Sequence, residues 1–106
     1  KTFIFAMIIA QDLEAVPFGK HVIFVPWRDL ARQTKAELDR FGITNQVIGD
    51  GCTHWNWGVA VTICVFASAH RLRKLPIRFR TKIVDEAHHL ELLPPWAKGF
   101  REIRRL

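Results

Sequence analysis

Two adjacent carboxylates followed by two histidines are the residues of this chain best suited to chemistry. Asp85 and Glu86 come directly after a short β-branched apolar run that ends at Val84, and His88 and His89 follow after one alanine. Such a run predicts a buried strand, and open α/β sheets bind their ligands beyond the carboxyl ends of the strands. There, one carboxylate could hold a magnesium ion while the other orients a water molecule, which is the chemistry of nucleoside-triphosphate hydrolysis.

The elements that must position these residues follow from the spacing of apolar side chains. Strands are predicted at residues 21–25, 46–48, 59–66 and 81–84. Helices are predicted at residues 2–15, 29–41, 68–74 and 96–106. Strands with continuous apolar runs are typical of a parallel sheet that is buried on both faces. The alternation of strands and helices therefore predicts an α/β fold, a parallel sheet with helices on both faces.

Several boundaries carry more specific expectations. The helix over residues 2–15 is apolar nearly all round, so we expect it to be buried. Asp29 is the expected N-cap of the helix over residues 29–41, and Gly42 is expected to stop it. Ser68 is the expected N-cap of the helix over residues 68–74.

Composition restricts the class of protein. The chain has 106 residues, enough for one small domain, and its 49% hydrophobic and 25% charged content is that of a globular protein. The net charge of +6 favours polyanionic partners such as nucleic acid, although solvated basic faces would give the same value. The apolar start is too short to span a bilayer, which needs about 20 residues, so we expect no membrane partner.

The two cysteines point to no metal centre. Cys64 lies in an apolar run and is expected to be a buried, inert thiol. Cys52 and His54 offer two metal ligands where a structural zinc site needs four, so zinc is not favoured. This cysteine usage fits a reducing compartment, and we expect a cytoplasmic location.

The string Asp85-Glu86-Ala87-His88 resembles the DEAH box of superfamily-two helicases and of related restriction-enzyme motor subunits. The resemblance implies that Asp85 binds magnesium, that Glu86 polarises the attacking water, and that His88 couples the nucleotide site to a second motor domain. His89 in place of the glutamate usual in RNA helicases favours DNA over RNA as the partner.

Other segments match the same family in the expected order. Lys1-Thr2 resembles the end of a Walker A loop, where the lysine reaches the nucleotide phosphates and the threonine binds magnesium. Pro26 and Arg28, in the segment 25–34, resemble helicase motif Ia, which contacts the nucleic-acid backbone. Ser68, in the segment 61–72, fits motif Ib only loosely, because the glutamine expected there is missing.

Together these matches imply a RecA-like P-loop NTPase fold truncated at both ends, with residues 1–106 forming part of a helicase ATP-binding domain. Its cofactors would be ATP and Mg²⁺. Its partners would be nucleic acid and the second RecA-like domain of a longer parent chain. We expect the 106-residue chain alone to hydrolyse ATP negligibly, because it lacks a glycine-rich phosphate cradle and an arginine finger.

Three alternatives remain open at this point. The parent could be the motor subunit of a restriction system, which shares these motifs. The chain could also be a nucleic-acid-binding remnant without ATPase activity. An unrelated P-loop ATPase, such as a transporter motor, would share the acidic pair, but the matches at Pro26, Arg28 and His88 count against it.

Overall fold

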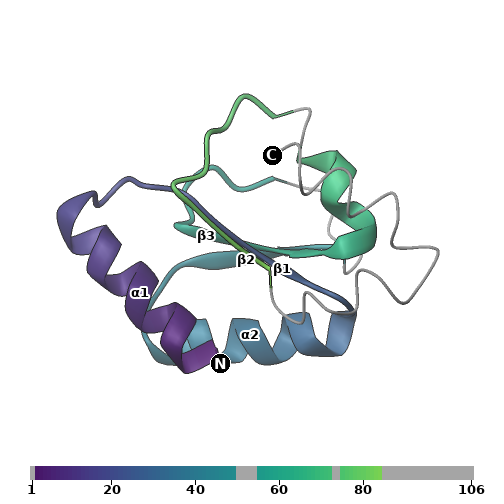
Figure 1. The fold of residues 1–106 in the computed structure, drawn as a ribbon, viewed down its shortest axis with the longest axis horizontal. Helices are drawn as coiled ribbons and strands as arrows, with labels where there is room; N and C mark the ends of the chain where they lie inside the picture. The colour runs from purple at the N-terminus through teal and green to yellow at the C-terminus, as the bar shows by residue number, and fades with distance from the viewer. Residues whose placement is uncertain (1, 50–54, 73–74, 85–106) are drawn as a thin grey trace.

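The computed structural model describes residues 2–49, 55–72 and 75–84, which form a four-stranded parallel sheet with helices (Figure 1). The strands are β1 (His21–Val25), β2 (Asn45–Ile48), β3 (Val61–Val65) and β4 (Thr81–Val84). Helix α1 (Thr2–Ala15) precedes β1, helix α2 (Arg28–Arg40) connects β1 to β2, and the 3₁₀ helix η1 (Phe66–Arg71) lies between β3 and β4. The strand order is β2-β3-β1-β4, with every neighbouring pair parallel. The predicted α/β class is confirmed.

The sheet separates two apolar layers, because successive residues of a strand point to opposite faces. On one face Ile23 and Val25 of β1 pack with Ala6 of α1 and Leu38 of α2. On the other face Val22 and Phe24 pack with side chains of η1 and the residue after it, namely Phe66, Ala69 and Leu72. Both α-helices thus cover one face and the 3₁₀ helix covers the other (Figure 1).

Strands β1 and β3 form the buried centre of the sheet, as their apolar runs predict. Every residue of both strands is buried. The expectation of a doubly buried strand over residues 81–84 is wrong. In β4, Lys82 is exposed and Ile83 and Val84 are only half-buried. The reason is position, because within the described residues β4 pairs with β1 alone and forms an edge of the sheet.

Helix α1 has the predicted bounds but is not buried all round. Ala6 and Ile9 are fully buried against the sheet, whereas Ile4, Met7 and Ile8 are 59%, 45% and 48% exposed. A helix that packs on a sheet buries one side only, and the described residues place nothing over the other side. No helix in the described part of the chain is long and apolar enough to cross a membrane.

Helix α2 begins one residue earlier than expected. Trp27 is the N-cap residue and makes no side-chain capping bond, so Asp29 lies in the first turn and is not the cap. The end agrees with expectation. Gly42 adopts a φ of +73°, and the amides of Gly42 and Ile43 donate to the carbonyl oxygens of Asp39 and Leu38. This Schellman arrangement satisfies the last carbonyls of the helix.

The helix predicted at residues 68–74 is instead the 3₁₀ turn η1, and it follows β3 without a loop. Val65 occupies the N-cap position, so the expectation that Ser68 is the cap is wrong. Phe66 and Ala69, three residues apart, are both buried, which is the spacing that a 3₁₀ turn places on one side. The turn therefore begins at Phe66, which is buried directly after the strand, and not at the expected N-cap Ser68.

Candidate nucleic-acid interface and nucleotide-binding edge

Parallel pairing brings the carboxyl ends of all four strands to one edge of the sheet. In the register of the sheet Val25 of β1 faces Val65 of β3, and Phe24 faces Val84 of β4. We call this side the carboxyl edge. Pro26 follows β1 there and η1 follows β3. Asp85, Glu86 and His88 follow β4 in the sequence but lie outside the described residues, as does Lys1.

Thr2 is the first residue of α1, and the helix determines which edge it approaches. The far end of α1 lies at the amino ends of the strands, where Asp12 contacts His21, the first residue of β1. Figure 1 shows α1 running antiparallel to β1. At 1.5 Å per residue, the ten residues from Thr2 to Asp12 cover about 15 Å, close to the length of a five-residue strand. The backbone of Thr2 is therefore directed toward the carboxyl edge.

Arg28 joins the loops that follow two different strands. It is the first residue of α2, and its Nε atom donates a hydrogen bond to the backbone carbonyl of Gly49 at 3.2 Å. Gly49 comes directly after β2, whereas Arg28 comes shortly after β1. The side chain of Arg28 is exposed, and Pro26 is buried. Pro26 is thus packed inside the turn that precedes α2, and the side chain of Arg28 lies at the surface, where it can contact a ligand.

Gly49 also brings the loop after β2 against the start of η1. Its φ of +106° lies in the left-handed region, which favours glycine. A β-carbon at this position would lie 2.9 Å from Ser68 Oγ and 3.0 Å from Val65 Cβ. Arg28, Gly49 and Ser68 thus converge at the carboxyl edge, each following a different strand. Of these three residues, sequence reasoning selected Arg28 and Ser68 and missed the positioning role of Gly49.

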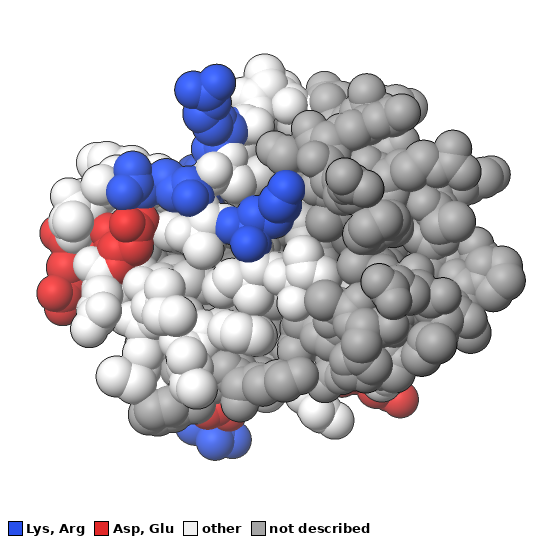
Figure 2. Space-filling model, viewed as in Figure 1, with Lys and Arg blue, Asp and Glu red and all other residues white. Residues whose placement is uncertain are grey.

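Basic side chains form a second surface away from this edge. Arg78, Arg80 and Lys82 are exposed at every second residue along the segment that leads into and includes β4. Figure 2 shows basic side chains gathered over this side of the molecule, beside acidic side chains toward the end of α1. Positive charge is therefore also presented along the segment that leads into and includes β4.

The described residues contain no metal centre of their own. No group of three or more histidine, cysteine, aspartate or glutamate side chains among them could hold a metal ion. Cys64 is free and buried, and burial raises the pKa of its thiol to about 12, so it stays protonated and inert as expected. A magnesium site in this chain would depend on the hard oxygen ligands expected at Thr2 and Asp85.

One polar group was not predicted from the sequence. Asp12, His21 and Arg80 meet at the amino ends of the strands, opposite the carboxyl edge. Asp12 and Arg80 are 68 positions apart. No motif or spacing connects them, so only the packing of α1 against β1 and β4 reveals the group.

Comparison with known families adds one finding. The family model described as "Type III restriction enzyme, res subunit" matches residues 1–105, nearly the whole chain. Neither the search of curated proteins nor the search of solved structures found a match.

Proposed function

Because this chain belongs to the family of the type III restriction enzyme res subunit, which carries a helicase-like ATP-binding domain, we propose that it is part of an ATP-dependent nucleic-acid motor. The proposed activity is translocation or unwinding driven by ATP hydrolysis, with DNA as the preferred partner. The family match favours the motor subunit of a restriction system among the alternatives. The free, buried thiol of Cys64 is compatible with a cytoplasmic location, which we also infer.

The observation that carries this proposal is the convergence of Arg28, Gly49 and Ser68 at the carboxyl edge. Ligands of open α/β sheets bind at that edge. An exposed guanidinium at the start of a helix suits a phosphate group, since both the side chain and the helix N-terminus attract negative charge. We propose that this cluster contacts the phosphate backbone of the nucleic acid, with Pro26 shaping the turn that carries Arg28.

We propose that hydrolysis takes place at the same edge, toward which the start of α1 and the end of β4 lead. In this proposal Thr2 and Asp85 hold Mg²⁺, whose chemistry is to neutralise charge on the nucleotide phosphates. Lys1 binds the β- and γ-phosphates. Glu86 accepts a hydrogen bond from the attacking water and polarises it. His88 links the nucleotide site to the second motor domain.

A substitution of Glu86 in the full-length protein tests the motor function. We expect Glu86→Gln to lower nucleic-acid-stimulated ATP hydrolysis by about 10²–10⁴-fold, the usual contribution of a catalytic acid or base. Nucleotide binding should be largely retained, because the amide preserves size and a hydrogen-bonding oxygen. Glu14→Gln, an isosteric change at an exposed site on α1, is the matched control and should leave hydrolysis unchanged.

The outcome separates the proposal from its main alternative. Near-normal turnover in the Glu86→Gln protein would remove Glu86 from the catalytic role and with it the motif assignment. A wild-type protein that binds DNA but does not hydrolyse ATP under any condition would identify the non-catalytic nucleic-acid-binding module instead.

A further inference from the structure

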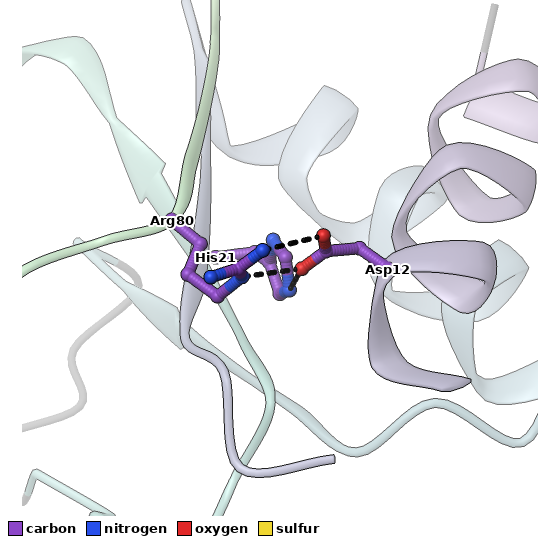
Figure 3. Close-up of polar contacts among 3 residues, drawn as sticks. All are labelled: Asp12, His21 and Arg80. Atoms are coloured by element: carbon purple, nitrogen blue, oxygen red, sulfur yellow. Dashed lines mark hydrogen bonds and ion pairs between the residues drawn. The ribbon is translucent and has the colours of Figure 1, made fainter. Parts of the chain in front are cut away.

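Asp12 and Arg80 form a two-pronged ion pair at the amino ends of the strands (Figure 3). The Nε atom of Arg80 donates to Oδ2 of Asp12 at 2.7 Å, and Nη2 donates to Oδ1 at 2.9 Å. Paired parallel bonds are the directionally specific form of arginine–carboxylate contact. Asp12 belongs to α1 and Arg80 immediately precedes β4. The pair therefore sets both a distance and an orientation between α1 and the start of β4.

The buried ring of His21 adds a third element to the contact. His21 is the first residue of β1, and its Nε2 atom lies 3.3 Å from Oδ2 of Asp12. The side chain is fully buried, and neither ring nitrogen has a hydrogen-bond partner among the described residues. Burial lowers the pKa of His21, although Asp12 opposes this, so the ring is held neutral. The carboxylate of Asp12 thus faces a cation on one side and a buried neutral ring on the other.

The path of Arg80 to Asp12 depends on local features of the backbone. The amide of Arg80 donates to the carbonyl of Lys20 at 2.7 Å, which holds the start of β4 beside β1. Gly19 leaves space for the arginine, because a β-carbon there would lie 2.5 Å from Arg80 Cδ. Lys20 in turn donates from Nζ to the carbonyl of Val59 at 2.9 Å, in the segment that leads into β3. The turn between α1 and β1 is therefore shaped to let this pair form.

Among the described residues, the other contacts of α1 specify its position along the sheet less closely. Strand β4 is joined to β1 by backbone hydrogen bonds, whereas α1 packs on the sheet through apolar residues such as Ala6 and Ile9. Apolar burial is strong but non-directional, so it resists separation more than sliding or rotation. A two-pronged ion pair is directional and resists both.

We propose that Asp12 and Arg80 are positioning residues that hold α1 in a fixed position relative to β4. By fixing these two elements, the pair aligns the nucleotide site at the opposite edge of the sheet. This inference rests on the function proposed above, in which Thr2 at the start of α1 and Asp85 after β4 share a magnesium ion. Thr2 is at the start of α1 and Asp85 follows the end of β4 in the sequence. The ion pair joins the opposite ends of the same two elements, near the end of α1 and just before β4. A rotation of α1 that the pair prevents would move the start of the helix relative to the end of the strand.

The test uses the full-length protein and measures KM for Mg·ATP and kcat of nucleic-acid-stimulated hydrolysis. The variants are Arg80→Gln, Asp12→Asn and the exchanged pair Asp12→Arg with Arg80→Asp. The control is Arg40→Gln, which removes an exposed ion pair with Glu37 inside α2 and links no two elements. We expect the two single variants to raise KM several-fold with kcat nearly unchanged, and the exchanged pair to restore part of the loss. A merely structural role would instead reduce the active fraction, lowering kcat with KM unaltered.

Two outcomes would overturn the inference: an unchanged KM in both single variants, or an equal rise in the Arg40→Gln control. A wild-type protein without ATP hydrolysis would refute the proposed function and not the positioning role. In that case amide hydrogen exchange in α1 tests the positioning role without any need for ATP hydrolysis. Faster exchange in α1 of the Arg80→Gln protein than in the Arg40→Gln protein supports positioning, and equal exchange in α1 rejects it.

Discussion

Gly49 and Ser68 approach each other so closely that a β-carbon on Gly49 would lie 2.9 Å from the serine hydroxyl oxygen. The contact joins the loop after β2 to the 3₁₀ turn after β3. The carbonyl of the same glycine accepts the hydrogen bond of Arg28, so one residue without a side chain determines how three loops meet.

Gly49→Ala should therefore weaken nucleic-acid binding. The added methyl group meets Ser68 and Val65, and alanine is strained at a φ of +106°, so the carbonyl that anchors Arg28 must move. We expect a several-fold loss of DNA affinity and a salt dependence reduced by about one phosphate contact, as for Arg28→Gln. Binding isotherms at several salt concentrations measure both.

Gly42→Ala is the matched control for that substitution. Gly42 also has a positive φ, of +73°, but a β-carbon there would have no atom of the described residues within 4 Å. It should lower stability through backbone strain and leave the DNA affinity of the folded protein unchanged. Equal losses of affinity in both variants would show that strain alone explains the effect and that Gly49 has no positioning role.

Asp85→Ala should weaken binding of the magnesium–nucleotide complex, because a carboxylate ligand is lost. The effect should appear as a higher Mg²⁺ concentration for half-maximal nucleotide binding, in contrast to Glu86→Gln, which should mainly lower turnover. Thr2→Ser retains the hydroxyl and should bind nearly as the wild type does. A magnesium titration of nucleotide binding in the full-length protein distinguishes these cases, and an unaltered titration in Asp85→Ala would exclude that residue as a metal ligand.

Acid should destabilise the fold in two steps that start from different groups. Burial lowers the pKa of His21 from 6.5, so the unfolded chain binds more protons than the folded chain as pH falls below that value. Stability due to the neutral ring is then present above pH 6.5 and is lost as pH falls toward the lower folded pKa. The hydrogen bonds from Arg80 lower the pKa of Asp12 from 3.8. The contribution of the Asp12 carboxylate to the free energy of unfolding is therefore lost only in stronger acid, as pH falls below 3.8.

His21→Leu should remove the first of these two steps. Urea denaturation midpoints at pH 7.5 and pH 5 should differ less in the variant than in the wild type, whatever the midpoint at pH 7.5. His70→Gln, at an exposed position in η1, serves as the control and should keep the wild-type difference. If the urea midpoint of the wild-type chain were the same at pH 5 as at pH 7.5, the assignment of this step to His21 would be contradicted.

Gly19→Ala should break the ion pair between Arg80 and Asp12, as Arg80→Gln does, without replacing a charged residue. Its β-carbon would lie 2.5 Å from Arg80 Cδ, so the arginine must leave the orientation in which it meets Asp12. We expect faster amide exchange in α1, comparable with Arg80→Gln. Gly58→Ala, whose β-carbon would lie 3.3 Å from Asn56 Oδ1 and near no described atom of α1 or Arg80, should leave exchange in α1 as it is. Exchange in α1 that Gly19→Ala does not alter would mean that the arginine reaches Asp12 by another path.

The sequence by itself determined the class of fold and most of its elements. Continuous apolar runs such as residues 21–25 are typical of parallel strands that are buried on both faces, and β1 is buried along its whole length. Gly42 likewise ends α2 for a local reason, because a left-handed residue satisfies the last carbonyls of a helix. The predicted motif residues Asp85, Glu86, His88 and Lys1 are also local patterns, and their roles remain predictions.

Only the tertiary structure decided the features that depend on what lies beside an element. Strand β4 was predicted from Ile83 and Val84 as buried on both faces, although it contains Lys82, because its position at an edge depends on which strands pair with it. The exposed side of α1, with Ile4, Met7 and Ile8, is equally invisible in a helix that is apolar all round. The meeting of Asp12 with Arg80, and of Gly49 with Ser68, requires the whole sheet to be assembled. Such contacts join residues distant in the chain, and no local propensity encodes them.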